Sequence, residues 1–518
     1  MRNADSWSLG HSVAHDSRAM LPVGGGQTSR LECRRGLLSH QMNAAQVRTV
    51  ERRALAPGED RGTTSNPPNV AWVRVAALAG PAVVDGFLSM TVGVSGLLMV
   101  GRLGDSALAG MGAALQLIWF AISFGAALGT GTTVLIAHAI GRGDKVQARH
   151  TLVQATLAAV TVSAFITSLA PWTREAVALL GGDAEVTRQG AEYLHVTVVG
   201  AIVLVPSAVF GGALRGSGDT RTPMFAGLLT NLVNLLVSPS LVFGLWGFPA
   251  LGVAGAAWGA TLGRGAGALF LLTILLRGRG VLALPFRHGA RSRWRLDIHE
   301  MTRVVRLSLP AAIEQGQSTM ATLLFGVLVL AQGTSISAAQ RVVFNLMGIS
   351  YLPAIGCATA ATILVGQAYG SGVPFPGGPA AITATSRAYV LSLAWLAASG
   401  GMFLVFAPSL VSLYTGVPEV VDAGIPGLRV IGMYLPISSL AIVFGSALRG
   451  SGDTRFPMIA SALVMWLVTL PLAWVAGNVL EAGLTGMLVS FSFGGLLGGI
   501  VLFLRWRSIE SSLRVAPR

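Results

Sequence analysis

Ala213-Leu-Arg-Gly-Ser-Gly-Asp-Thr-Arg221 occurs twice in this chain, the second time as Ala447-Leu-Arg-Gly-Ser-Gly-Asp-Thr-Arg455. The two copies are 234 residues apart, and Pro-Met follows both of them, at positions 223–224 and 457–458. A nine-residue identity with a matching continuation indicates an internal duplication. The sequence therefore predicts two homologous halves.

Weaker matches extend the duplication toward the N-terminus, where the offset between the halves is 229 residues. The matching pairs include Pro81 with Pro310, Asp85 with Glu314, His138 with Gln367 and Gly141 with Gly370. Because these pairs follow the same order in both halves, they indicate equivalent positions in the fold.

The composition indicates the class of protein. The 518 residues are 53% hydrophobic and 11% charged, whereas soluble domains carry roughly 25% charged residues. Positions 1–69 hold 15 of the 58 charged side chains, which leaves 43 for the other 449 positions. Because so few charges cannot coat a soluble surface, the composition excludes a soluble multidomain enzyme and predicts an all-α polytopic membrane protein.

Apolar segments follow the polar N-terminal stretch, and each is long enough to cross a bilayer as a helix. They lack the ten-residue alternation of a membrane barrel. We expect twelve spans, at 72–100, 107–137, 151–171, 190–214, 222–244, 252–276, 304–330, 337–367, 384–407, 426–447, 457–477 and 482–504.

The spans define the expected organisation of the chain. Residues 1–69 are polar and rich in Gly, Ser and Arg, so we expect a disordered cytoplasmic tail, within which Met42 is an alternative start of translation. The other predicted segments are an N-lobe at 70–276, an Arg-rich cytoplasmic linker at 277–303, a C-lobe at 304–507 and a cytoplasmic tail at 508–518.

Basic residues predict the orientation. Arg and Lys gather in the connections after spans 2, 4, 6 and 10 and at the C-terminal end. Cytoplasmic loops carry such an excess, so both termini are expected in the cytoplasm and the chain in the inner (plasma) membrane. The basic residues behind the net charge of +14 thus lie where a membrane protein carries them, and no nucleic-acid partner is expected. Cys33 and Cys357 make no disulfide framework.

Six spans in each half is an even number, so the two halves have the same orientation. Their pseudo-two-fold axis then runs along the membrane normal, an arrangement that places a transporter's substrate cavity between the lobes. Alternating access by rocking of the lobes follows naturally. Channels also contain repeats, so the pattern favours a carrier without excluding a channel.

Several motifs resemble the multidrug and toxic compound extrusion (MATE) family. They are the two LRGSGDTR segments, Val100-Gly-Arg-Leu-Gly104 after span 1 and Leu364-Val-Gly-Gln-Ala-Tyr-Gly370 after span 8. The similarity implies twelve helices in two lobes, and export of organic cations or drugs driven by an H+ or Na+ gradient. We expect a monomer in the bilayer with no cofactor beyond the coupling ion.

Asp85 and Glu314 are the foremost candidates for ion or substrate binding. Each follows its span's proline by four residues. A carboxylate inside an apolar helix costs roughly 2.5–3.5 kcal/mol on insertion scales and usually faces a protein interior or a watery cavity. Such a group can hold either a proton or an organic cation, and Gln315 beside Glu314 could contribute. The alternative is a carboxylate that snorkels or caps near a helix mouth.

The chain departs from the resembled family in its N-lobe. Aligned on the glycines after span 1, the position where many relatives carry an acid is Gly96. In span 5 the family pattern Asn-x-x-x-Asp-Pro becomes Asn234-Leu-Leu-Val-Ser238-Pro239. An ion site built on those two acids cannot operate here, although Asn234 remains, so coupling is expected at Asp85, Glu314 or another acid.

The repeated loops have a structural explanation. We expect Gly216 and Gly450 in the left-handed position after a helix end. Asp219 and Asp453, with the Thr that follows each, are expected to cap the next helix. The arginines of the motif, Arg215 and Arg449 among them, are expected to anchor the loops on the cytoplasmic side, with gating between the lobes as the alternative.

Other polar groups in the spans are less decisive. Arg341 is a candidate partner of Glu314 or of anionic substrate groups, and His138 is expected to meet free carbonyls at a helix end. The sequence contains no metal-binding cluster, phosphate loop or nucleophile arrangement, so we expect no metal site and no enzyme activity.

Two other functions remain open. A flippase for lipid-linked precursors would use a related two-lobe architecture with a strongly basic cavity, for which Arg341 and Arg264 are the visible contributors. A membrane receptor or scaffold would fit the composition, but it would leave the repeat and the paired carboxylates unexplained.

Overall fold

The computed structural model describes residues 68–181, 183–278, 282, 296–371 and 378–515. All regular secondary structure in these ranges is helical. The predicted tail at 1–69 lies outside the described residues except for Pro68 and Asn69, which begin the first helix. Most of the predicted linker at 277–303, together with Cys33 and Met42, also lies outside them.

Six spans make up the first half of the bundle. Two short elements, η2 (Ala170–Trp172) and α5 (Thr173–Ala178), separate spans 3 and 4. The spans are α2 (Pro68–Val100), α3 (Asp105–Gly141), α4 (Lys145–Ser168), the pair α6 (Ala184–Val199) and α7 (Ala201–Gly216), α8 (Arg221–Phe243) and α9 (Gly252–Arg277).

The second half repeats the order. Its spans are α10 (Ile298–Leu330), α11 (Thr334–Gly370), α12 (Gly378–Ser412), α13 (Pro418–Gly450), the series α14 (Arg455–Val464), η5 (Met465–Thr469) and α15 (Leu470–Asn478), and α16 (Gly483–Val515). Two bounds differ from the sequence prediction, since α10 begins inside the predicted linker and α16 continues into the predicted C-terminal tail.

Ten helices in the described part of the chain are long and apolar enough to cross a membrane. An eleventh span is the pair α6 and α7, which is bent by 50° at Gly200. The remaining one of the twelve predicted spans is α10, whose 33 residues are long enough but include Arg303, Arg306 and Glu314. One of these charged residues, Glu314, faces a cavity between the halves.

A glycine lies at the bend in the fourth span. A Cβ at Gly200 would lie 2.7 Å from the side chain of Thr261 on α9, so the two helices are closely packed at this point. The series α14, η5 and α15 instead contains a π-helical turn, Met465–Thr469, which its counterpart α8 does not share.

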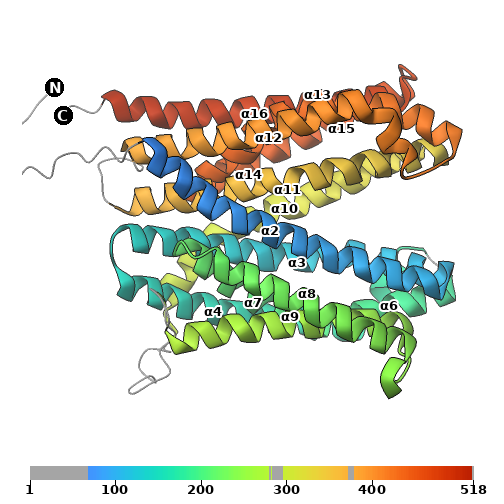
Figure 1. Cartoon of the computed structure of the whole chain (residues 1–518), viewed down its shortest axis with the longest axis horizontal. Helices are drawn as coiled ribbons and strands as arrows, with labels where there is room; N and C mark the ends of the chain where they lie inside the picture. Colours follow the sequence, from blue (N-terminus) through green and yellow to red (C-terminus); the bar gives the residue numbers. More distant parts are fainter. Residues whose placement is uncertain (1–67, 182, 279–281, 283–295, 372–377, 516–518) are drawn as a thin grey trace, which may run out of the picture. The chain divides into compact units, whose positions relative to one another are not determined.

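The first helix of each half packs across the boundary between the halves. Helix α2 contacts α8 of its own half and α11 of the other, while α10 contacts α14 of its own half and α3 of the other. Figure 1 shows α2 lying between the two groups of helices. Helices α2, α3, α10 and α11 therefore form the seam between the halves, and we call them the seam helices.

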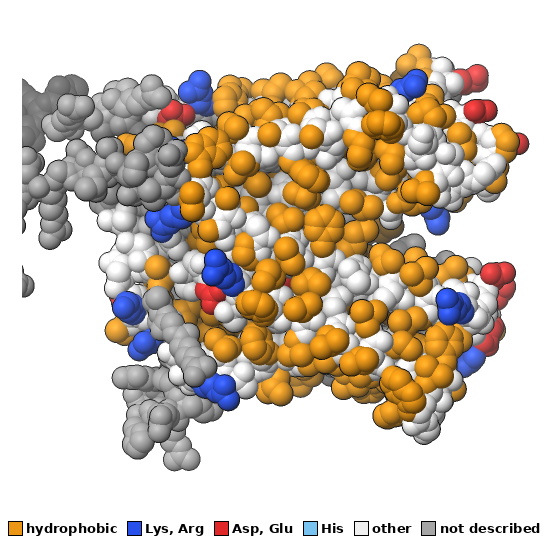
Figure 2. Space-filling view, viewed as in Figure 1, with side chains coloured by type: hydrophobic (Ala, Val, Ile, Leu, Met, Phe, Trp, Pro, Cys, Tyr) orange, Lys and Arg blue, Asp and Glu red, His pale blue; other side chains and the backbone are white. Residues whose placement is uncertain are grey.

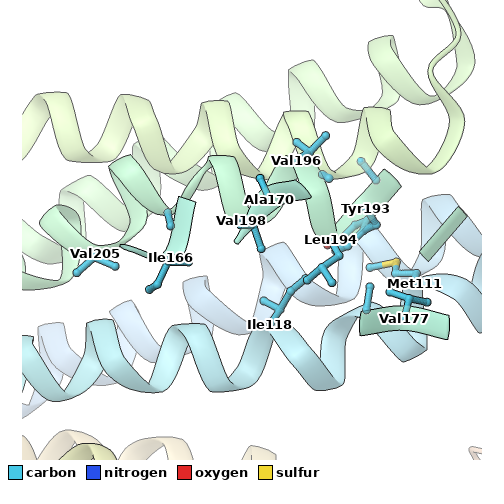
Figure 3. Packing of buried hydrophobic residues seen from close by; sticks show 14 of the residues in the cluster. Met111, Ile118, Ile166, Ala170, Val177, Tyr193, Leu194, Val196, Val198 and Val205 are labelled. Atoms are coloured by element: carbon cyan, nitrogen blue, oxygen red, sulfur yellow. The ribbon is translucent and has the colours of Figure 1, made fainter. Parts of the chain in front are cut away.

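Each half has its own apolar core. In the first half, side chains from α3, α4, α6 and α7 interlock between the helices (Figure 3). They include Met111, Ile118, Ile166, Leu194 and Val205. A second core in the other half is built on residues of α10 to α16, among them the fully buried Phe325 and Phe403. The seam links the two cores, because Val304 of α10 packs into the first-half core and α2 shares an apolar cluster with α11, α12 and α13.

The surface of the helical part is largely apolar along the bundle, and charged side chains gather at its two ends (Figure 2). This is the distribution expected of a protein whose sides face lipid. We call the end that carries residues 217–220 and 451–454 the repeat-loop end. At the opposite end, on the face shown, the surface is hollowed between the two halves.

Candidate functional site

A cavity of about 610 Å³ lies between the halves. Helices α2, α3 and α7 line it from one half, and α10, α11 and α13 from the other. Most lining residues are small or apolar. Among the described residues that line it, the charged ones are Asp85, Arg215, Glu314 and Arg449. The cavity therefore places the two predicted carboxylates in one chamber.

In the first half the carboxylate is paired with an arginine of the repeated motif. Arg215 Nη1 donates to Asp85 Oδ2 at 3.2 Å. Arg215 is in the last turn of α7, and Asp85 lies on α2, four residues after Pro81. The two side chains are 26% and 24% exposed, so the pair is partly desolvated yet accessible from the cavity.

The second half contains the equivalent pair. Arg449 Nη1 lies 2.9 Å from Glu314 Oε1 and 3.1 Å from Oε2, and Arg449 Nη2 donates to Ser446 Oγ. The exposed fractions, 22% and 20%, match those of the first pair. Charge-assisted hydrogen bonds of this kind are the stronger class. The two pairs are related by the offsets of the sequence repeat, 229 for the acids and 234 for the arginines.

These contacts correct two predictions. Arg215 and Arg449 do not anchor the loops, because their guanidinium groups turn into the cavity and bind the carboxylates. Arg341 does not pair with Glu314, which is bound to Arg449 instead; the side chain of Arg341 is exposed and does not line the cavity. Gln315 lines the cavity beside Glu314, as the sequence suggested.

The glycines of the repeated motif adopt backbone conformations that differ from the prediction. Gly216 and Gly450 are helical, and the left-handed positions are Gly218 (φ 94°) and Gly452 (φ 95°). Gly216 is needed for packing, because a Cβ there would collide with the carbonyl of Thr133. The same holds in the other half, where a Cβ on Gly450 would lie 2.7 Å from the carbonyl oxygen of Thr362.

Asp219 and Asp453 cap the helices that follow the loops. Asp219 Oδ1 accepts from the backbone N–H of Arg221 and of Thr222. Asp453 Oδ1 accepts from the N–H of Phe456, and its Oδ2 binds Arg505 at 3.2 Å. The threonine after each aspartate makes no side-chain cap. Capping by the aspartates is confirmed, and both lie outside the cavity lining.

Two equivalent hydrogen bonds join the halves at the repeat-loop end. His138 Nε2 lies 2.9 Å from the carbonyl oxygen of Gly450, and Gln367 Nε2 donates to the carbonyl of Gly216 at 3.3 Å. Because a carbonyl only accepts, Nε2 of His138 carries the proton. His138 meets a helix-end carbonyl as expected, but that helix belongs to the other half. Its ring also stacks on Tyr369 of the other half, with centroids 5.2 Å apart.

The same end is closed by contacts between α4 and the start of α10. His150 Nε2 lies 3.0 Å from Asp297 Oδ2, and Thr151 donates to the buried Glu300 at 2.7 Å. Hydrogen bonds from His150 and from the backbone N–H of Glu300 hold the pKa of Asp297 below its ordinary value. Hydrogen bonds between the halves thus gather at the repeat-loop end.

Asn234 does not belong to the cavity. Its side chain is buried, accepts from Ser95 at 3.0 Å and donates to Ser238 at 2.8 Å. A side chain at Gly96 would meet the methyl group of Met111. The place where the resembled family carries acids in this half is therefore filled by a neutral, hydrogen-bonded cluster that leaves no free carboxylate.

Comparison with known families identifies the chain. A family model described as MatE matches residues 81–240 and 310–475, one match in each half, and together these cover more than half of the chain. The chain belongs to the MatE family. The duplicated loops, the cavity and the seam described above are thus features of a MATE transporter.

This MatE chain is 29% identical to the "Probable multidrug resistance protein NorM" of Thermotoga maritima over 411 residues, which cover 79% of this chain and 86% of the relative. It is 24% identical to the "Uncharacterized transporter YisQ" of Bacillus subtilis, with 83% and 93% covered. At this coverage both relatives match parts of both halves.

Solved structures share the fold. The TM-score is 0.79 to an "Outward-facing conformation of a multidrug resistance MATE family transporter", at 22% identity and covering 86% of this chain and 97% of that one. The same figures hold for a transporter from Pyrococcus furiosus, which is described by a reverse polarity of its binding pocket. At this identity the likeness shows the architecture, twelve helices in two lobes.

Sequence reasoning missed the arginines of the cavity and the reciprocal bonds of the seam. The repeat carried a signal for both, since Arg215 matches Arg449 and His138 matches Gln367. When both lobes carry a polar side chain at the same position inside a span, those side chains are candidates for contacts between the lobes. The repeat offsets alone did not say which side chains meet.

Proposed function

We propose that this MatE chain is a secondary active exporter that moves organic cations, drugs among them, out of the cell in exchange for H+ or Na+. The two lobes would expose one cavity alternately to either side of the membrane. The observation that carries the proposal is the placement of Asp85 and Glu314, at matching positions of the two lobes, in that single cavity.

The closed end supports alternating access. The lining residues of α3 extend to Thr133, and Gly141, where α3 meets α11, is eight residues further on, about 12 Å along the helix. Bonds between the lobes gather at that level, while the opposite end is hollowed (Figure 2). With the repeat-loop end on the cytoplasmic side, as the arginines predict, this arrangement is the outward-facing state.

Coupling through the cavity carboxylates is supported by the state of the N-lobe. The cluster of Ser95, Asn234 and Ser238 is neutral and has its hydrogen bonds made within itself. A coupling ion therefore has the cavity acids, Asp85 and Glu314, as the accessible carboxylates near the axis. The multidrug resistance relatives favour organic drugs as cargo.

The direct test uses inside-out vesicles energised to hold an inward-acid gradient. A panel of cationic dyes is added, and proton release is followed with a fluorescent pH probe, with and without Na+. We expect dye-triggered release by the wild type and a clear reduction of it in Glu314→Gln. A wild-type protein that reaches the membrane and responds to no dye under either ion would contradict the proposal.

The flippase alternative finds less support. The cavity contains two arginines, but each is bound to a carboxylate, so its lining has no net charge, whereas a pyrophosphate head group calls for a strong positive excess. If the dye test fails, flipping of a lipid-linked pyrophosphate in proteoliposomes becomes the next assay.

A further inference from the structure

We propose that Arg215 and Arg449 act as internal counter-ions that switch the charge of the cavity, so that each lobe exchanges one proton and two protons drive out one organic cation. This deepens the proposed function and rests on it. It assigns the two arginines a role in coupling, and it names the N-lobe exchange site as Asp85 rather than the cluster around Asn234.

The first step is geometric. Both carboxylates are bound by an arginine in the last turn of the helix before a repeated loop, at 3.2 Å in the N-lobe and 2.9 Å in the C-lobe. The four side chains are between 20% and 26% exposed. A ligand or a proton that enters the cavity can therefore reach each pair, while water screens the pair only in part.

The second step is the charge of the lining. With both acids ionised, two negative and two positive groups give a net charge of zero. With both acids protonated, the arginines remain charged, because a guanidinium does not lose its proton in proteins, and the net charge is +2. Two carboxylates without arginines would instead change from −2 to zero.

The third step is the consequence for cargo. An organic cation can enter the neutral cavity and share a carboxylate with its arginine. Protonation of Asp85 and Glu314 then leaves the cation facing two like charges at short range in a partly dry chamber, where charges repel strongly. The arginines therefore add an expelling force that two bare carboxylates would lack, since those become neutral when protonated and merely stop attracting the cation.

The fourth step is the number of protons. Asp85 and Glu314 occupy matching positions and have matching partners, so we assign the same role in proton exchange to both pairs. Two protons enter from outside, one on each carboxyl oxygen. The cation leaves to the outside, and both protons leave to the inside when the acids ionise again. The cycle moves two protons inward for each cation carried outward.

The test measures cation binding and proton release on the full-length protein in lipid nanodiscs. Tetraphenylphosphonium serves as the probe, because its charge does not change with pH. Calorimetry across a pH series, in two buffers of different ionisation enthalpy, gives the dissociation constant and the protons released per cation bound. Thermal unfolding of each variant shows that it is folded.

We expect the wild type to release up to two protons per cation, Asp85→Asn and Glu314→Gln up to one each, and the double variant none. Arg215→Gln and Arg449→Gln remove a repelling charge, so each should bind the probe roughly tenfold more tightly. The matched controls Arg215→Lys and Arg449→Lys keep the charge and should stay near the wild-type affinity.

Three outcomes would overturn the proposal while leaving export intact. They are an unchanged proton count in Asp85→Asn, an unchanged or weaker affinity in both Arg→Gln variants, and release of Na+ in place of protons by the wild type. A wild type that neither binds nor transports tetraphenylphosphonium or any panel dye contradicts the proposed function and this proposal with it.

Discussion

Gly141 and Gly370 lie at matching positions of the two lobes, and at each of them the helix of the other lobe leaves no room for a side chain. A Cβ on Gly141 would collide with the carbonyl of Gln367 and lie 3.0 Å from the Cα of Gly370. A Cβ on Gly370 would collide with the carbonyl of His138. Helices α3 and α11 therefore cross in backbone contact at the repeat-loop end.

Gly141→Ala should open this crossing. Alanine favours an isolated helix over glycine by roughly 1 kcal/mol, but overpacking a tight contact costs about 1–3 kcal/mol, and here the contact is with backbone. We expect the repeat-loop end to separate and transport to fall. Spin labels at Arg142 and Ser371, the residues that end α3 and α11, should report a longer distance between the lobes.

The matched control for this change is Gly348→Ala on α11. An added Cβ at Gly348 meets nothing within 4 Å. It should leave the distance between the labels and the transport rate at wild-type values. If Gly141→Ala behaves like Gly348→Ala, the backbone crossing does not hold the lobes closed.

The reciprocal hydrogen bonds predict a graded series at His138. His138→Gln keeps an N–H donor and copies the Gln367 side of the seam, so it should preserve the closed distance. His138→Ala removes one hydrogen bond between the lobes, worth about 1 kcal/mol, or roughly a fivefold shift toward the separated state. Gln367→Ala removes two, the bond to the carbonyl of Gly216 and the bond from Arg74, so its shift should be at least as large. The label distances should show these shifts, and a closed fraction in His138→Ala equal to that of the wild type would count against the bond.

Stability of the contact between α4 and α10 should depend on pH. A carboxyl group whose pKa is lower in the folded state stabilises the fold above its unfolded pKa and loses this effect as the pH falls through the folded value. Because the pKa of Asp297 is lowered by His150 and by backbone N–H groups, Asp297→Asn should reduce the unfolding temperature at neutral pH. The difference from the wild type should shrink in acid below about pH 3.9, the ordinary Asp value.

Asp183→Asn provides the control for this prediction. Asp183 precedes α6 but makes no side-chain cap hydrogen bond. Its substitution should leave the unfolding temperature close to the wild type across the same pH series. A wild-type and Asp297→Asn difference that is equal in acid and at neutral pH would contradict the account given for Asp297.

The N-lobe cluster should matter for stability and not for coupling. Asn234→Ala removes a buried amide that bonds to Ser95 and Ser238, which leaves buried hydroxyl partners and costs about 1–3 kcal/mol. Dye export by folded protein should still depend on the ion gradient. Loss of ion dependence in Asn234→Ala, with export retained, would place the coupling site in this cluster.

The sequence predicted the fold in considerable detail. Runs of apolar residues gave twelve spans that the helices follow, since a bilayer requires each crossing helix to satisfy its own backbone. The repeat located equivalent positions, Asp85 with Glu314 among them. These features depend on local composition and on order along the chain, so they are readable without a structure.

The site was predicted less well, for a physical reason. The ion pair of Arg215 with Asp85 joins residues that are 130 positions apart, and an arginine near a helix end is equally compatible with water. The rule that places glycine after a helix end pointed to Gly216, whereas packing against Thr133 keeps that glycine helical and moves the left-handed turn to Gly218. Contacts between helices decided both cases.

The exchange of His138 and Gln367 across the seam has a consequence for symmetry. A residue of one lobe binds the last residue of a helix in the other, and its counterpart returns the same bond, which is the defining property of an isologous interface in a two-fold dimer. The single chain thus has, between its two repeats, the closed two-fold symmetry of a dimer. The helix end before each copy of the loop is therefore held by a helix of the opposite lobe as well as by its own lobe.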